Sequence, residues 1–512
     1  MNLTKKKKLG AFYTDNELVN FLTEKILIND PNRILEPSFG DGIFIKNLYK
    51  KNYNNEIVGI EIDKKTFKEI KINNNKLKLI NKNFLEYNEN KGFDAIIGNP
   101  PFVRTRFLPS EQKKISVNYY KNILNLKSLS DPSIWLLFVY HSLNLLNKNA
   151  SIGLVLPYDF TFVNYAKPLW KKIFSNFGTV EIHHTKKRYF TDILQDTIIF
   201  YADKYGEQTN FLSYFTYQKD ITDNNFFKKK ITINDILNDN KPFKRALLPT
   251  QYFKIEKKIK KNLIKISDIA KFHIGYVSGN KNFFHPNELT IKKFNLKRNS
   301  LIQTIADTKI LKNIGIFTSN INKKQLSNLF YPKKINSYDL NYIKYGEDNL
   351  VNKQHKTLSR KKWFMVPLIK PPQYFINVFD EFPLMILNNA NYIATNTFLC
   401  GYLNNDIEKK ILLNNWYNSL TELFIEIEIH SLGGGMLVFV PNEISKIYIA
   451  NNNIINDNFI KNIDFYSKTK NIKKIVELGN KFILKKYLKL ADKEINIIIK
   501  CVNILKFWRI PK

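Results

Sequence analysis

Hydrophobic residues in the first part of the chain follow two alternating patterns. Short apolar runs, most of them ended by Gly, Pro, Asn or Glu, predict buried strands, and segments with apolar residues at helical spacing predict amphipathic helices. Strands that alternate with helices are typical of a doubly wound α/β domain. Predicted helices begin near residue 15, at residue 43 and at residue 133. The predicted strands cover residues 34–35, 57–60, 77–80, 95–97, 152–156, 180–183 and 197–201.

The first predicted strand leads into a glycine-rich loop. Residues 36–42 read Glu-Pro-Ser-Phe-Gly-Asp-Gly and precede a helical pattern. A strand, a glycine loop and a helix in this order form a cradle for nucleotides. The next strand ends at Glu61, about 20 residues further on, where a dinucleotide-type fold places a carboxylate for ribose hydroxyls. We therefore expect a ligand site at the carboxyl ends of the strands.

The fourth predicted strand stops at Asn99, Pro100, Pro101 and Phe102. Because proline has no backbone N–H, this loop presents carbonyl oxygens beside the amide oxygen of Asn99. Such an uncharged group of acceptors suits an exocyclic amine, whose two N–H bonds would point at Asn99 Oδ1 and the Pro100 carbonyl. Phe102 offers a flat face for stacking a planar ring. The structural alternative is that Asn-Pro opens a turn and Pro-Pro ends the strand.

Charge and composition narrow the class of partner. The 512 residues include 80 Lys and Arg against 45 Asp and Glu, a formal net charge of +35, which indicates a polyanion such as nucleic acid. Abundant Lys, Asn and Ile would also follow from an AT-rich genome. Two cysteines exclude a disulfide framework and a four-thiolate metal site. Since no apolar run is long enough to span a bilayer and no signal peptide is evident, we expect a soluble cytoplasmic protein without a membrane partner or a bound metal.

The chain changes character after a predicted linker at residues 241–250. Short strands, Asn- and Gly-rich turns, and mixed Lys and aromatic residues replace the earlier pattern, and residues 453–512 are predicted to be largely helical. These features predict two domains, 1–240 and 250–512, the second of mixed α+β class. Lys361 and Lys362 are candidates for contacts with DNA phosphates, and the alternative is that they only solvate a surface.

Taken together, the motifs and their order resemble the γ-class DNA adenine-N6 methyltransferases of restriction–modification systems. The resemblance covers nearly the whole chain. It implies a Rossmann-like, seven-stranded class I methyltransferase domain followed by a DNA target-recognition domain. It also implies S-adenosyl-L-methionine as cofactor, double-stranded DNA as substrate and flipping of the target base. The residues that match the family's cofactor-binding motifs are Thr14, Glu36, Pro37, Phe39, Gly40, Asp41, Gly42, Glu61, Ile62, Asn83 and Phe84.

The resemblance also assigns the reaction site. Asn99, Pro100, Pro101 and Phe102 match the family's catalytic motif, and Phe190 falls where the family places an aromatic that packs on the flipped base. Two positions depart from the family: Asp15 replaces a usual proline, and Asn83 replaces an aspartate that accepts from the cofactor's amino group. An amide oxygen can still accept that bond. Structural alternatives stay open for single residues: helix capping for Thr14 and Asp41, a solvated strand end for Glu61, and core packing for Phe84 and Phe190.

Other functions remain to be weighed. The same acceptor loop would suit cytosine N4, adenine in ribosomal RNA or a protein glutamine, although the large basic second half disfavours the glutamine substrate. A bifunctional restriction enzyme would need a nuclease domain, and the first cofactor motif starts too early for one to precede it. A non-catalytic specificity module is disfavoured by the intact Asn99 loop. We expect a monomer, with a cognate restriction endonuclease as a possible partner at the same DNA site.

Overall fold

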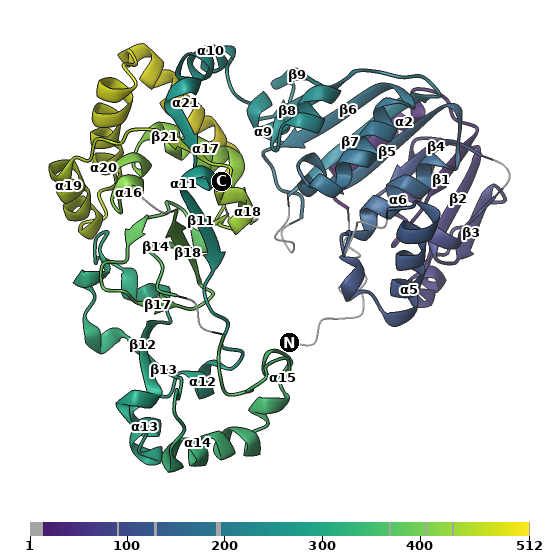
Figure 1. Ribbon diagram of the computed structural model, residues 1–512. Helices are drawn as coiled ribbons and strands as arrows, with labels where there is room; N and C mark the ends of the chain where they lie inside the picture. The colour runs from purple at the N-terminus through teal and green to yellow at the C-terminus, as the bar shows by residue number, and fades with distance from the viewer. Residues whose placement is uncertain are drawn as a thin grey trace. The chain divides into compact units, whose positions relative to one another are not determined.

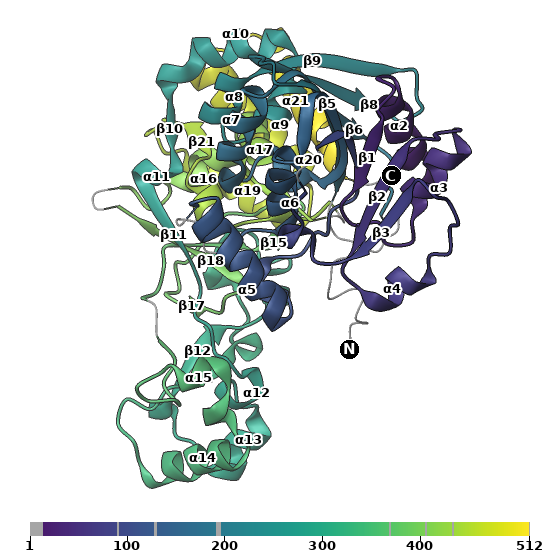
Figure 2. The same ribbon diagram turned by 90° about the vertical axis from the view of Figure 1, so that its right-hand side faces the viewer.

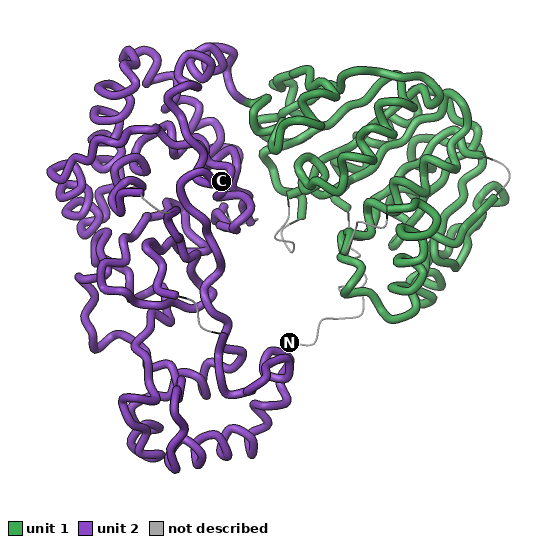
Figure 3. Tube along the Cα trace, viewed as in Figure 1, with its two compact units in different colours: residues 1–247, 511 green, residues 248–510, 512 purple. Residues whose placement is uncertain are grey.

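The computed structural model describes residues 14–89, 92–126, 131–190, 196–367, 370–404, 407–432 and 435–510. The chain forms two compact units with their boundary between Leu247 and Leu248 (Figure 3). The first unit holds one large sheet, and the second holds several small sheets and a set of helices (Figure 1). Each unit is described by itself below.

A nine-stranded sheet with the order β3-β2-β1-β4-β5-β7-β6-β8-β9 organises the first unit (Figure 1). Its first five strands in that order are parallel, and β7 runs antiparallel to both neighbours. The predicted α/β fold is confirmed, and all seven predicted strands are present. The count of seven was too low, because β8 and β9 extend the sheet. The strands are β1 (Arg33–Glu36), β2 (Glu56–Glu61), β3 (Leu77–Asn81), β4 (Phe93–Gly98), β5 (Leu146–Pro157), β6 (Phe177–Thr185), β7 (Thr197–Tyr205), β8 (Phe211–Tyr217) and β9 (Phe226–Thr232).

Helices cover both faces of this sheet (Figure 2). Successive residues of a strand point to opposite faces, so Ile96 of β4 joins one apolar core while Ala95 and Ile97 join the other. One core contains residues of α2 (Asn16–Leu27) and α3 (Ile43–Lys50), with α4 (Lys64–Glu69) beside them. The opposite core contains residues of η1 (Phe84–Glu86), α6 (Ile134–Leu143), α7 (Lys167–Phe174) and α8 (Ile233–Asn238), with α5 (Ser110–Asn118) packed against it.

The predicted linker is partly wrong. Residues 242–246 form helix α9 (Pro242–Ala246), and Phe243 is buried against Trp170 and Tyr214 of the first unit. Its aromatic ring therefore fastens this segment to the core. The first unit ends at Leu247, inside the predicted linker at residues 241–250 and a few residues after the predicted domain end at residue 240.

The second unit is a mixture of small sheets and helices, as predicted. A four-stranded sheet has the order β11-β18-β14-β16, and three smaller sheets accompany it. Helices α17 (Ser419–Glu428) and α21 (Asp492–Arg509) pack together, and Arg509 forms a buried ion pair with Glu426, with Nη2 and Oε1 2.7 Å apart. No described helix in either unit is both long and apolar enough to cross a membrane.

The elements of the second unit begin with α10 (Thr250–Ile259), β10 (Leu263–Lys265), α11 (Ile266–Ile269), β11 (Ala270–Ile274), α12 (Lys281–Phe284), α13 (Glu288–Phe294), β12 (Leu301–Ile305), β13 (Ser327–Phe330), α14 (Ser337–Asp348) and α15 (His355–Leu358). The middle part contains β14 (Tyr374–Asn377), β15 (Phe379–Asp380), β16 (Ile386–Leu387), β17 (Ile393–Ala394) and β18 (Phe398–Leu403). The last part contains α16 (Ile411–Trp416), α17 (Ser419–Glu428), β19 (His430–Ser431), β20 (Leu437–Val438), α18 (Pro441–Ile444), β21 (Tyr448–Ala450), α19 (Asp457–Lys468), α20 (Ile472–Gly479), η12 (Asn480–Tyr487) and α21 (Asp492–Arg509).

Candidate active site

A pocket opens at the carboxyl ends of the parallel strands of the first unit. The strand order runs outward from β1 towards β3 and from β4 towards β5, so the order reverses between β1 and β4. Open α/β sheets bind ligands at such a reversal, because the connections leave in opposite directions and open a crevice. The pocket encloses about 1170 Å³ of empty space, including solvent at its mouth. Its walls are Thr14, Glu36, Pro37, Ser38, Phe39, Gly40, Asp41, Ile43, Phe44, Glu61, Ile62, Asp63, Thr66, Lys82, Asn83, Phe84, Asn99, Pro101, Leu108, Gln112, Ile134 and Phe138.

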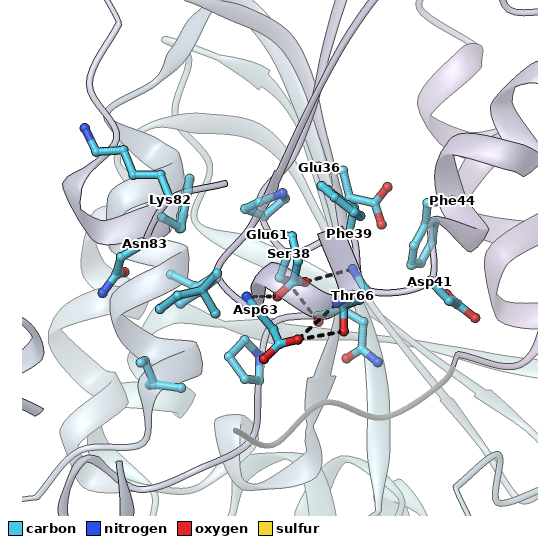
Figure 4. A pocket seen from close by; sticks show the side chains of 18 of the residues that line it. Glu36, Ser38, Phe39, Asp41, Phe44, Glu61, Asp63, Thr66, Lys82 and Asn83 are labelled. Carbon is cyan, nitrogen blue, oxygen red and sulfur yellow. Dashed lines mark hydrogen bonds between the residues drawn. The ribbon is translucent and has the colours of Figure 1, made fainter. Parts of the chain in front are cut away.

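The glycine loop between β1 and α3 forms one side of this pocket (Figure 4). Gly40 and Gly42 have φ angles of +54° and +71°, a region that disfavours residues with a Cβ. At Gly42 a Cβ would also lie 3.2 Å from Ile70 Cδ1. Asp41 Oδ1 accepts weakly from the Ile43 N–H at 3.3 Å, at the start of α3. Gly42 thus shapes the loop without lining the pocket, while Asp41 does both.

Glu61 lies between the two sides of the pocket (Figure 4). Its Oε2 accepts from the Gly40 N–H at 3.0 Å, and its Oε1 accepts from the Asp63 N–H at 2.8 Å. Burial raises the pKa of Glu61, and these N–H donors partly oppose that rise. The carboxylate is therefore held in one orientation, with remaining lone pairs able to accept from ligand hydroxyls.

Glu36, the last residue of β1, is buried at the end of the pocket nearest β4. Its Oε2 has no hydrogen-bond partner. Burial raises the pKa of Glu36 well above its usual value, and the carboxylates of Asp41 and Glu61 add to the rise. A backbone hydrogen bond from Ile45 partly opposes the rise, but the partnerless Oε2 still makes this acid costly to ionise unless a ligand brings a positive charge or a donor.

The raised pKa of Glu36 should make the unfolding temperature of the protein depend on pH. The folded-state pKa of Glu36 is raised, so this group stabilises the folded state at low pH, and its contribution is lost as the pH rises above the value for an unfolded carboxyl, about 4.3. In Glu36→Gln, the unfolding temperature should fall less between pH 5 and pH 8 than in the wild type. Calorimetry of the ligand-free proteins measures this. Glu24→Gln on the exposed side of α2 serves as the control, and equal slopes for Glu36→Gln and wild type would contradict the assignment.

Asn99 lies directly after β4, beside the glycine loop. Its Nδ2 donates to Thr14 Oγ1 at 3.1 Å, and its carbonyl oxygen accepts from Ser38 Oγ at 3.2 Å. With Nδ2 engaged, Asn99 Oδ1 is left as a buried acceptor without a partner. Pro101 lines the pocket next to it, whereas Pro100 is buried and its ring is not among the pocket walls.

The structure corrects one helix boundary. The sequence predicted Thr14 as a candidate N-cap, but Asp15 caps α2, and its Oδ1 accepts from the Glu17 N–H at 2.8 Å. Thr14 is therefore available to hold the Asn99 amide. Asp15, the residue that replaces the family's usual proline, has a structural role here. Residues 10–13, which precede Thr14 in the segment that resembles the family's N-terminal cofactor motif, lie outside the described residues.

The opposite end of the pocket is an apolar slot. Phe84 is 2% exposed, and its ring centroid lies 4.9 Å from that of Phe138 on α6 and 4.7 Å from that of His141. His141 is buried between the Tyr87 carbonyl, 2.7 Å from Nε2, and the Tyr119 hydroxyl, 2.9 Å from Nδ1, and burial lowers its pKa. Phe84 is thus both wall and core.

Asn83 borders this slot but is already engaged. Its Oδ1 accepts from the Leu85 N–H at 3.0 Å and caps η1. Asn83 and Lys82 lie across the pocket from Asp41 and Phe44 (Figure 4). The amide oxygen of Asn83 therefore serves the backbone, and only its second lone pair could accept from a ligand.

Phe102 and Phe190 are not among the pocket walls. Phe102 is half-buried and packs against both apolar cores. Phe190 is 7% exposed and belongs to the core around α2, which contradicts an open stacking position in this conformation. Part of the loop that follows Phe190, residues 191–195, lies outside the described residues. Lys361 and Lys362 are exposed in the second unit after α15.

Sequence reasoning missed several pocket residues. Ser38, Asp63 and Lys82 directly adjoin predicted positions, so the strand ends themselves could have indicated them. Leu108 and Gln112 at α5, and Ile134 and Phe138 of α6, reach the pocket only because these helices pack near η1. No local sequence signal shows that packing.

The fold and the site together define the class of the first unit, an α/β domain of the Rossmann-like class I methyltransferase type. The whole chain superposes on the type IIL restriction–modification enzyme MmeI, solved in complex with DNA, with a TM-score of 0.60 at 12% identity, over 99% of this chain and 77% of that one. At that identity the likeness concerns the fold.

Family matches then give the particular group. Residues 12–190 match the family described as Eco57I restriction-modification methylase, and residues 240–484 match the C-terminal domain of type II methyltransferase M.Eco57I. The type II methyltransferase M.AccI of Acinetobacter calcoaceticus is 25% identical over 473 residues, covering 87% of this chain and 86% of that protein. M.HincII of Haemophilus influenzae is 28% identical over 213 residues, 39% of this chain and 38% of that protein. The chain belongs to the type II DNA methyltransferases of restriction–modification systems.

Proposed function

We propose that this protein transfers a methyl group from S-adenosyl-L-methionine to N6 of adenine at a specific site in double-stranded DNA. The observation that carries the proposal is the buried, partnerless Oδ1 of Asn99 at the reversal of strand order, beside a pocket with carboxylate and apolar walls. An uncharged acceptor there suits the N–H bonds of an exocyclic amine and offers no donor to a carbonyl oxygen.

The residues present fit S-adenosylmethionine. Glu61 can accept from two ribose hydroxyls, the slot at Phe84 and Phe138 can hold a flat purine, and Glu36 can offset an ammonium group. When bound, the cofactor supplies an activated methyl group on a sulfonium. The slot and Asn99 belong to a single continuous pocket. A ligand with a purine at one end and a reactive centre at the other requires such a pocket.

In this mechanism the chain positions the amine. Asn99 Oδ1 and the Pro100 carbonyl would accept the two N–H bonds, which would leave the nitrogen lone pair free to react. The hydrogen bond from Asn99 Nδ2 to Thr14 Oγ1 fixes the orientation of the side-chain amide and therefore the position of Oδ1. The rate gain comes from orientation and fixed dipoles, and no strong base is needed, because the methylated amine loses its proton to solvent.

A base inside a duplex cannot reach this pocket, so the target adenine must leave the stack. We propose that it stacks on Phe102, which follows the acceptor loop and is only partly buried. Stacking of this kind contributes about 1–3 kcal/mol per base. Phe190 would have to leave the core around α2 before it could add a second face.

Recognition of the DNA site is assigned to the second unit. A specific surface needs base-edge contacts, with Lys and Arg on phosphates to set the register. The net charge of +35 over the whole chain and the DNA bound to MmeI support DNA as the partner. We further infer that the protein acts in the cytoplasm as a monomer and that it protects sites cut by a cognate restriction endonuclease.

Neutralising lysines in the second unit tests that division. Lys361→Gln with Lys362→Gln should weaken binding to every DNA sequence and flatten the dependence of log affinity on log salt by about one unit per lost phosphate contact. Fluorescence anisotropy over a salt series measures it. Lys473→Gln with Lys474→Gln on α20 removes the same charge and is the control. An unchanged slope for the first pair would show that these lysines only solvate a surface.

The class of acceptor is tested with labelled cofactor. Incubation of the protein with duplex DNA, ribosomal RNA and a cell extract, each with methyl-labelled S-adenosylmethionine, should place label in the duplex DNA. Label confined to RNA or to protein would point to the rival substrates and would overturn the proposal.

A further inference from the structure

One polar side chain in the pocket has no role in the scheme above. Among the pocket walls that the structure describes, Glu36, Asn99 and Gln112 carry a buried side-chain oxygen without a hydrogen-bond partner. Glu36 is the last residue of β1, and Asn99 directly follows β4. Both therefore belong to the end of the pocket where we propose that methyl transfer occurs. Gln112 comes from α5 and was not indicated by any motif.

Gln112 belongs to the end of the pocket that holds the apolar slot. It lies near the start of α5 (Ser110–Asn118), and α5 packs against η1, the short helix that begins with Phe84. Leu108, just before α5, lines the pocket with it. Gln112 therefore lines the same pocket as the slot residues Phe84 and Phe138.

A slot that takes adenine needs an acceptor for the exocyclic amine, since a donor there would favour a 6-oxo purine. Asn83 Oδ1 is the other acceptor at this end, and it already receives the Leu85 N–H at 3.0 Å. Gln112 Oε1 receives no hydrogen bond. A buried carbonyl oxygen without a partner is unfavourable, and a ligand N–H would relieve it. A carboxamide also suits adenine, because it can accept from the amine and donate to a ring nitrogen.

We propose that Gln112 accepts a hydrogen bond from the exocyclic amine of the cofactor's adenine and makes the pocket selective for a 6-amino purine. This rests on the proposed function, because it assumes that the pocket holds S-adenosylmethionine. Gln112 is thus a specificity-determining residue for the cofactor, because its Oε1 is without a partner while Asn83 Oδ1 already accepts from the Leu85 N–H.

The test compares two ligands that differ at that amine. S-adenosylhomocysteine carries the 6-amino group, and S-inosylhomocysteine carries an oxygen in its place. Titration calorimetry of the full chain should show that the wild type prefers the adenosine compound at least about tenfold. Gln112→Ala should bind both compounds nearly equally, with the affinity for the inosine compound unchanged, which also shows that the variant is folded. Gln112→Glu, which keeps an acceptor, should retain the preference.

Several results would overturn the inference. Full discrimination in Gln112→Ala would do so, and loss of discrimination in Asn83→Ala alone would assign the amine to Asn83. If Gln112→Ala binds both compounds like the wild type but loses affinity for DNA with an unpaired target adenine, Gln112 reads the substrate base. Failure of the wild type to bind S-adenosylhomocysteine at all would instead refute the proposed function, so the two failures are distinguishable.

Discussion

Replacing Asn99 with alanine should reduce methyl transfer by about 100- to 1,000-fold, the loss seen when one preorganised polar group at a reacting centre is removed. The variant loses the acceptor that orients the amine, whereas the carboxylate and the apolar slot that would hold the cofactor are untouched. Its affinity for S-adenosylhomocysteine should therefore stay within about twofold of the wild type, because no large binding contact is lost. Single-turnover transfer to duplex DNA and calorimetry measure the two quantities.

Thr14→Val is the matched variant for this prediction. It keeps Asn99 but removes the hydroxyl that receives Asn99 Nδ2 at 3.1 Å. The amide can then rotate, so we expect an intermediate loss of rate with cofactor affinity preserved. A normal rate in Asn99→Ala would refute the role of the acceptor loop, and equal losses of rate and cofactor affinity would mean that Asn99 serves the cofactor instead.

Glu61→Ala should have the second large effect, on cofactor binding. Bonds from ribose hydroxyls to a carboxylate are charge-assisted, each contributing about 1.5–3 kcal/mol, so the loss of two should weaken S-adenosylmethionine by tenfold or more. The same change frees the N–H groups of Gly40 and Asp63, which Glu61 holds at 3.0 and 2.8 Å, and this loosens the glycine loop as well. Calorimetry with the purified variant gives the dissociation constant.

Glu56→Ala at the start of the same strand is the control for Glu61. Glu56 forms an ion pair with Arg33 at 2.9 Å and lies away from the pocket walls. Its loss should leave the dissociation constant for S-adenosylmethionine unchanged. If Glu61→Ala bound the cofactor as tightly as this control, the ribose assignment would be wrong and another pocket residue would carry it.

The positions where the strands end were predictable from the sequence, because neighbouring residues in the chain determine them. Gly40 and Gly42 adopt positive φ angles, which glycine reaches without strain because it has no Cβ. The two prolines after Asn99 end β4 because they cannot donate backbone hydrogen bonds to a neighbouring strand. The residues that follow β1, β2, β3 and β4 accordingly meet in one pocket, as their order along the chain implied. Their chemical roles remain predictions.

Packing and sheet edges were not predictable in this way. Strand β9 contains three consecutive lysines and is mostly exposed, since it lies at the edge of the sheet, and it therefore shows no buried apolar run. Asp15 rather than Thr14 caps α2, and Thr14 instead accepts a hydrogen bond from Asn99, 85 positions away. Gln112 reaches the pocket because α5 packs against η1. Each of these features is set by contacts between distant segments.

The identity of the methylated nucleoside decides whether the protein methylates adenine N6 in DNA. Plasmid DNA lacking methylated bases should be treated with the protein and S-adenosylmethionine, digested to nucleosides and examined by mass spectrometry, with the Asn99→Ala variant in parallel. We expect N6-methyladenine in the wild-type sample and none in the sample treated with the variant. N4-methylcytosine without N6-methyladenine, or no methylated nucleoside from a protein that binds both cofactor and duplex, would contradict it.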